Sequence, residues 1–360
     1  MLQGLYSARS EKGRIALGRF PYTYARVSVM RSFLLGKDDY QRLMKMDVNE
    51  IASYLQGSQY RKEIDELGIR FKGMQLMELA LNRNLANTWA KLKNISPPNL
   101  RSLIAAYLLR VDIWNIKTLV RGKYTKLAQD DLRAMLIPSG FLNEKRLAEL
   151  ARKETVEEIL KSTGFIDYSQ LSWAVEKFRE TKSIIEIENA LDRFYYSSME
   201  AFTRRIPEEG VLFRQFIDYE LEISALINIL RLKRTGTPSK DITRFLIIPK
   251  TIRPLASKMA NAASASDAAR LIEQSRFGKA AESGIREFVA NGSLVRLELD
   301  LSKLTLKHSA LLIHQHPLTV SVILGYMFAK ELEVRNIKLM LKAKSLGIDP
   351  DFVEQQIVAV

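Results

Sequence analysis

The most constraining feature of this 360-residue sequence is an internal repeat with a period of about 110 residues. The pattern E-x-[AD]-L-[NDS]-[RK] occurs three times, and its copies start at Glu78, Glu188 and Glu298. A second pattern, N-I-x2-[LM]-x-[RK], follows each copy, and its own copies start at Asn115, Asn228 and Asn336. A repeat of order and spacing indicates that one structural unit is present three times.

The composition and the apolar spacing indicate that this unit is helical. Proline and glycine are scarce, with 10 and 17 residues of 360, as expected where helices predominate. Apolar residues recur every three or four positions, for example at Ile104, Leu108 and Val111. A proline lies between the two patterns of every copy, where it can end one helix and open the next. The sequence therefore predicts an all-α fold of three similar domains, each with a hairpin of two helices.

One segment alternates like a β-strand. Leu297, Leu299 and Leu301 occupy every second position, which is the period of a half-buried strand. The corresponding segments at Glu78 and Glu188 have helical spacing. We therefore predict a helix in the third copy as well.

Polar, turn-prone stretches near residues 123–129 and 235–240 are the expected domain boundaries. The predicted organisation is an N-terminal extension followed by three helical repeats: 1–18, 19–127, 128–240 and 241–360. Each repeat has a predicted N-cap residue ahead of an apolar run: Asp47, Thr155 and Ser266. Glu50 and Glu158 lie three positions after the first two and are the expected capping-box partners.

The repeated glutamates could supply acid–base chemistry, but a structural role fits their setting better, because each lies in an otherwise apolar helical face. A buried carboxylate or amide without a hydrogen bond costs about 1–3 kcal/mol. We therefore expect each Glu and Asn to bridge the two helices of its hairpin. The patterns also place basic residues at repeated positions: Arg83, Arg193, Arg121, Arg234 and Lys342. The last three lie in final helical turns, where a cation interacts well with the helix C-terminus or pairs with charges on a solvated face.

No recognisable catalytic or metal-binding apparatus is present. Cysteine is absent, which excludes disulfides, thiolate nucleophiles and thiolate metal sites. His314 and His316 would point to different sides of a helix, so with His308 they are interpreted as part of a polar turn before Pro317. Gly122-Lys123 lacks the other residues of a phosphate-binding loop. We predict a protein that is not an enzyme and has no cofactor.

The formal net charge of +14 indicates an acidic partner or surface. A nucleic acid is the weaker interpretation, because the basic residues are dispersed among acids and no nucleic-acid-binding motif accompanies them. An anionic membrane surface, or acidic subunits near one, explains the charge equally well. Residues 1–18 lack the layout of a secretory signal, and the best apolar run, 309–328, is interrupted by polar residues and a proline. We expect a cytosolic chain without a membrane-spanning segment.

Several runs in the first repeat resemble a known family. They are Tyr22-Thr23-Tyr24-Ala25-Arg26-Val27-Ser28-Val29-Met30-Arg31-Ser32, Asn49-Glu50-Ile51-Ala52-Ser53-Tyr54-Leu55 and Tyr60-Arg61-Lys62-Glu63-Ile64. With the repeated patterns, they resemble the C subunit of archaeal A-type ATP synthases, whose family includes the d subunit of eukaryotic V-type ATPases. The similarity extends over about residues 20–350. The third repeat diverges most, with Ser302 and Lys303 where the second has Asp192 and Arg193.

This resemblance implies a non-catalytic rotor subunit of a proton- or sodium-translocating ATP synthase. It implies a funnel of three helical domains around a pseudo-threefold axis, bound peripherally at the cytoplasmic face of the membrane. The implied partners are the proteolipid (c/K) ring on one side and the D and F subunits of the central stalk on the other. The alternative is a helical scaffold or adaptor that binds an acidic partner or an anionic surface.

Overall fold

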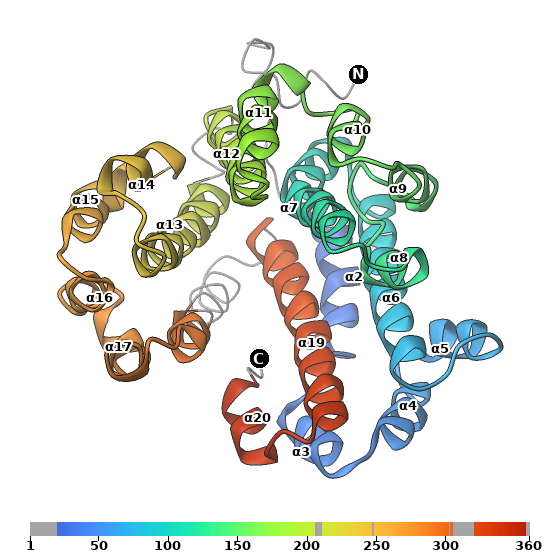
Figure 1. Ribbon diagram of the computed structural model, residues 1–360. Coiled ribbons are helices and arrows are strands. Elements are labelled where there is room, and N and C mark those ends of the chain that lie inside the picture. Colours follow the sequence, from blue (N-terminus) through green and yellow to red (C-terminus); the bar gives the residue numbers. More distant parts are fainter. Residues whose placement is uncertain (1–19, 206–210, 247, 302, 305–319, 358–360) are drawn as a thin grey trace.

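The computed structural model describes residues 20–205, 211–246, 248–301, 303–304 and 320–357, and every regular element in these ranges is helical (Figure 1). The all-α prediction is therefore confirmed. Residues 295–301 are helical, so the interpretation of the alternating leucines as a helix is also confirmed. The predicted extension 1–18, the three histidines, Ser302 and Pro317 lie outside the described residues.

Long helices occur in pairs, each preceded by three short helices. The long pairs are α6 (Gly73–Asn94) with α7 (Pro98–Tyr124), α12 (Ile185–Thr203) with α13 (Val211–Arg234), and helical residues 295–301 with α19 (Val320–Leu346). The short helices of the first set are α3 (Lys37–Lys45), α4 (Val48–Gln56) and α5 (Arg61–Gly68). Those of the second set are α9 (Glu144–Ala151), α10 (Val156–Lys161) and α11 (Ser172–Thr181). Those of the third set are α15 (Arg253–Asn261), α16 (Ala265–Glu273) and α17 (Gly278–Asn291). The remaining helices are α2 (Pro21–Arg31), α8 (Gln129–Met135), α14 (Ser239–Phe245), α20 (Pro350–Gln356) and the short 3-10 turns Tyr168–Gln170 and Lys250–Ile252.

The three long helices α7, α13 and α19 end in the same way. Each is followed by a residue with positive φ, and these residues are Lys126, Gly236 and Gly347. Next to each, a backbone N–H donates to a carbonyl in the last turns of the helix: Leu127 to Gly122, Thr237 to Leu232 and Ile348 to Ala343. This is the bond of a Schellman cap, and a seven-residue helix (α8, α14 or α20) follows it each time. The caps define the register of the repeat, in which position 126 corresponds to positions 236 and 347.

Two of the three predicted N-caps are confirmed. The Asp47 side chain accepts hydrogen bonds at the start of α4, with Glu50 completing the capping box, and Thr155 caps α10. Glu158 does not complete a box with Thr155, because its carboxylate accepts from the Glu154 N–H at 3.1 Å. In the third copy Ser266 is wrong: Ser264 has the extended backbone and accepts from the Asp267 N–H, so Ser266 already lies inside α16.

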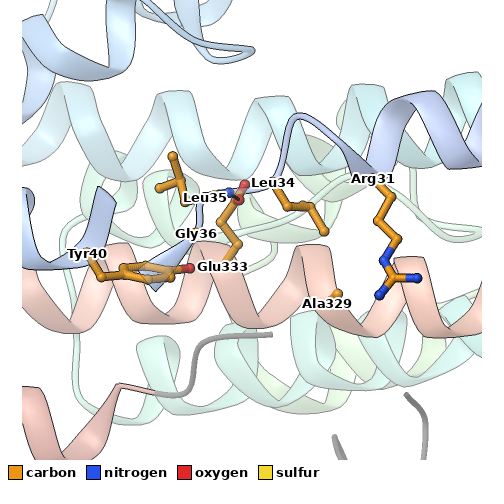
Figure 2. A pocket seen from close by; sticks show the side chains of 7 residues that line it. All are labelled: Arg31, Leu34, Leu35, Gly36, Tyr40, Ala329 and Glu333. Carbon is orange, nitrogen blue, oxygen red and sulfur yellow. Dashed lines mark hydrogen bonds between the residues drawn. The ribbon is translucent and has the colours of Figure 1, made fainter. Parts of the chain in front are cut away.

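A buried carboxylate in each of the helices α7, α13 and α19 holds the segment that leads into the next set of short helices. Asp112 accepts from the backbone N–H groups of Phe141 and Leu142, at 2.7 and 3.0 Å. At the equivalent position of α19, Glu333 accepts from the Leu35 N–H at 2.5 Å, beside a cavity of about 110 Å³ (Figure 2). In α13, Glu222 accepts from the Thr251 hydroxyl. These three carboxylates were not predicted, although their recurrence at equivalent positions within apolar runs was a usable signal.

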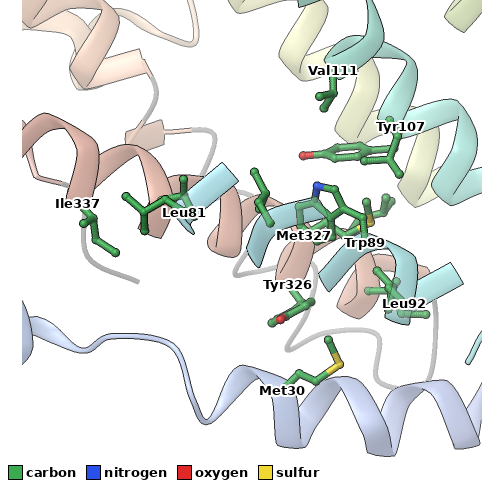
Figure 3. Packing of buried hydrophobic residues seen from close by; sticks show 14 of the residues in the cluster. Met30, Leu81, Trp89, Leu92, Tyr107, Val111, Tyr326, Met327 and Ile337 are labelled. Carbon is green, nitrogen blue, oxygen red and sulfur yellow. The ribbon is translucent and has the colours of Figure 1, made fainter. Parts of the chain in front are cut away.

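The apolar interior consists of three main clusters, and the long helices connect them. The last turns of α7 pack with α8–α12, and the last turns of α13 pack with α14–α17 and residues 294–301. The first cluster combines α2–α6 and the first half of α7 with α19, and Figure 3 shows Trp89 and Tyr107 beside Met327 in it. The two ends of the described chain therefore share one core.

The contacts between the sets close a cycle. Helix α7 of the first hairpin packs on α12 of the second, and α19 of the third packs on α6 of the first. Between the second and third hairpins, Arg231 of α13 pairs with Glu298. In Figure 1 the sets follow one another around the molecule, and α19 (red) lies beside α6 and α2.

We expect Gly140→Ala to lower the free energy of unfolding by about 2–4 kcal/mol, because the added methyl group would overlap the buried Asp112 carboxylate. Gly36→Ala is the control. The methyl group added there would lie 3.7 Å from the nearest atom, an Asp39 oxygen, and the φ of Gly36 is negative. Chemical denaturation of both variants measures the difference. Equal stability of the two variants would contradict this account of Asp112.

Candidate functional site

A cavity of about 680 Å³ lies between the long helices α7, α13 and α19. Each helix contributes side chains at equivalent positions of the repeat. One such set, in the register of the helix caps, is Trp114, Ser224 and Arg335. The cavity is therefore centred where the three copies meet.

A charged cluster joins the three long helices at the cavity wall. Its members are again equivalent residues: Arg110 of α7, Glu220 of α13 and Glu331 of α19. The Arg110 guanidinium pairs with Glu220 at 2.8 Å and also with Glu331. It lies 4.7 Å from the centre of the Tyr107 ring. One cation thus holds two carboxylates, and the cluster carries a surplus negative charge when both are ionised.

This surplus affects Glu331 most. Burial raises the pKa of the Glu331 carboxyl to about 7, Arg110 opposes the shift, and the nearby Glu220 charge adds to it. Within the described part of the chain, Glu331 Oε1 is buried without a hydrogen-bond donor. The cluster therefore sits at a balance between ionised and neutral Glu331 near neutral pH.

Ion pairs between successive units recur in the same register. Arg121 binds both oxygens of Glu188, at 2.5 and 2.9 Å, and Arg231 binds Glu298 at 2.5 Å. Both pairs span 67 residues. The repeated glutamates thus connect one unit to the preceding one. Glu78 has no such pair in the described contacts. Burial lowers the pKa of the Lys338 ammonium on α19, and the charge of Glu78 opposes this shift.

The predicted basic residues differ in their position in the repeat and in their contacts. Arg231, not Arg234, occupies the position equivalent to Arg121, and Arg234 donates to the Gly292 carbonyl at 3.0 Å. Lys342 is at that position in α19 and is exposed. Arg83 and Arg193 are exposed on α6 and α12, and Arg83 lies 3.9 Å from Glu66.

The predicted asparagines do not form one set. Asn115 is buried, and its amide bonds both backbone groups of Ile137, at 2.8 and 2.9 Å, where a bridge to Glu78 was expected. Asn336 occupies the equivalent position and hydrogen-bonds Tyr40. In the register of the helix caps, Ala225 stands there in the second copy, and Asn228 is one turn later at the cavity wall. The prediction that Asn115 and Glu78 bridge the two helices of the first hairpin is therefore wrong. Asn115 instead holds the segment that leads to the next unit.

The described residues contain no group of three or more His, Asp or Glu side chains placed to hold a metal ion. In the same part of the chain, no helix combines the length and apolar character needed to cross a bilayer.

Comparison with known proteins identifies the family. The family model described as ATP synthase (C/AC39) subunit matches residues 23–356. Similar proteins include the C subunit of the A-type ATP synthase of Methanosarcina mazei, 34% identical over 98% of this chain and 97% of its own length. The protein of the same name from Haloferax volcanii is 32% identical over 94% of this chain and 97% of its own length. The chain therefore belongs to the ATP synthase (C/AC39) subunit family, as its resemblance predicted.

We expect Glu331→Gln to change the pH dependence of stability. The carboxyl has a pKa of about 7 when folded, above its ordinary value of 4.5, so its contribution to stability is present at acid pH and lost as pH rises to 7. Between pH 5 and pH 8, the free energy of unfolding of the variant should rise by up to about 3 kcal/mol relative to that of the parent. Asp112 also has a pKa of about 7, but its effect cancels in the comparison. Denaturant unfolding at both pH values measures this, and an unchanged difference would contradict it.

Arg110→Gln should cost about 3–5 kcal/mol of folding free energy at pH 8, because it leaves two largely buried carboxylates without their cation. Arg121→Gln is the matched change at a half-exposed pair, where the loss should stay below about 1 kcal/mol. Thermal and denaturant unfolding of the two variants provide the measurement. A loss no larger for Arg110 than for Arg121 would show that the central cluster does not join the helices.

Proposed function

We propose that the chain is a non-catalytic central-rotor subunit of a proton- or sodium-translocating ATP synthase. In this proposal it lies at the cytoplasmic face of the membrane and connects the proteolipid (c/K) ring to the D and F subunits of the central stalk. Three helical repeats, 19–127, 128–240 and 241–360, surround a pseudo-threefold axis as a funnel. Support comes from membership of the ATP synthase (C/AC39) subunit family and from relatives named as C subunits of A-type ATP synthases.

The observation that carries the proposal is the cycle of three helical units around one cavity. A part that transmits torque must resist shear between its units. Here α7 and α13 each contribute to two apolar clusters, and Arg110 links three helices. Close-packed interiors have low compressibility and transmit strain. Such a body suits a coupling between a ring of many identical subunits and one asymmetric shaft.

A helical adaptor for an acidic partner is the second candidate, and the net charge of +14 favours it. Such an adaptor would bind its partner through screened charges, so its complexes would dissociate at high salt. It would have no affinity for a proteolipid ring or stalk once the membrane is solubilised. This difference separates the two functions in one experiment.

The test is affinity purification of the tagged full-length chain from detergent-solubilised membranes of its source organism. We expect the proteolipid and the stalk proteins to co-purify in fixed ratio, with the chain between ring and stalk in a cryo-EM map. Their retention in about 0.5 M salt, where the Debye length falls below about 5 Å, supports a packed interface. Two results together would favour the adaptor. The ATP synthase would lack the chain, and an acidic protein would co-purify with the tagged chain at low salt and dissociate from it at high salt.

A further inference from the structure

The outer face of α2 carries a stripe of exposed apolar side chains. Tyr22, Val29 and Phe33 are 65%, 58% and 59% exposed. They are spaced seven and four residues apart, so they follow one side of the helix and of the turn that ends it. Single exposed apolar residues are normal, whereas several on one face mark a site of contact with a protein or a membrane.

The opposite side of α2 is fixed to the core. Thr23, Val27 and Met30 are buried, and the helix packs on α19 (Figure 1). The Thr23 hydroxyl also donates to the Ile95 carbonyl at 2.9 Å, in the turn between α6 and α7. A helix held along one side cannot turn to bury the other. The stripe therefore stays on the surface of the folded chain.

Basic side chains accompany the stripe. Arg26 is exposed between Tyr22 and Val29 on the same side of α2, and its side chain forms no hydrogen bond or ion pair with any described residue. No acidic residue occurs in α2. Residues 1–36, which precede α3, contain six basic residues and one acidic residue. One tenth of the chain thus carries five of its fourteen surplus positive charges.

This combination is typical of a surface that contacts anionic lipid. Aromatic side chains are enriched where lipid headgroups meet water, and Tyr22 and Phe33 lie at the two ends of the stripe. An anionic membrane surface attracts each nearby Lys or Arg, and this attraction adds to the burial of apolar groups among the headgroups. A helix of 11 residues is about 16 Å long, so the whole stripe can contact a flat surface at once.

We propose that the outer face of α2 is a lipid-binding surface that lies along an anionic bilayer. Arg26 pairs with headgroup phosphates, and Tyr22, Val29 and Phe33 enter the boundary between the headgroups and the acyl chains. This contact needs neither a proteolipid ring nor a stalk. It therefore goes beyond the proposed function and can fail while that function stands.

The test is sedimentation of the purified full-length chain with phospholipid vesicles in about 0.1 M salt. We expect binding to vesicles that contain about 30% phosphatidylglycerol, and little binding to vesicles of phosphatidylcholine alone. Arg26→Gln should weaken binding about fivefold, because one cation near the headgroups is lost, and Arg26→Glu should weaken it further. Tyr22→Ser combined with Phe33→Ser should weaken it at least about tenfold, because apolar burial is lost.

Ile69 and Arg70 provide the matched control. Both side chains are exposed, and that of Arg70 has no ion-pair partner among the described residues. They directly follow α5, which lies away from α2 in Figure 1. Ile69→Ser combined with Arg70→Gln should leave vesicle binding unchanged. Thermal unfolding of every variant checks that the exposed substitutions leave the fold intact.

A fluorescent label locates the contact. The chain has no cysteine, so Val29→Cys and Ile69→Cys each accept a single label. On anionic vesicles, the emission of an environment-sensitive label should move to shorter wavelength at position 29 and stay unchanged at position 69.

Three results would overturn the inference. They are an equal loss of binding in the α2 and control variants, a label response that is the same at both positions, and the absence of binding to anionic vesicles. The last result would leave a protein as the partner of the stripe, and the proposed function would be unaffected.

Discussion

The sharing of the long helices α7 and α13 between two apolar clusters each is the constraint on which this architecture depends. The first half of α7 packs in the first cluster and its last turns in the second, and α13 is likewise divided between the first cluster and the third. No unit can move away from its neighbour without exposing part of a helix that it shares. Burial of apolar side chains therefore stabilises the association of the units as well as each unit's own fold.

Polar residues are repeated at equivalent positions only where they have the same structural role in each copy. Asp112, Glu222 and Glu333 keep a carboxylate in every copy, because each has to hold the segment leading into the next short helices. At the centre the copies meet one another, and three identical charges there would repel. The equivalent residues are accordingly one arginine and two glutamates. Electrostatics thus makes the three repeats diverge where they meet.

Local sequence patterns were sufficient to predict the helices. The contacts between helices join residues far apart in the sequence, and local patterns could not predict them. The repeat, the all-α class and the caps Asp47 and Thr155 followed from spacing and from N-cap chemistry. The asparagine of the second copy was aligned one turn late, because a shift of one helical turn nearly restores the same helix face and preserves the apolar pattern. The pairing of Arg121 with Glu188 spans 67 residues and two units, so no periodicity within a helix could reveal it.

The same divergence also changes the lining of the cavity. Trp114, Ser224 and Arg335 stand at equivalent places around it, so its three sides present an aromatic ring, a hydroxyl and a cation. A partner inserted there would meet different chemistry in each of three orientations, and only one would match its own surface. A threefold frame with unlike walls therefore favours a single orientation of any asymmetric group that occupies it.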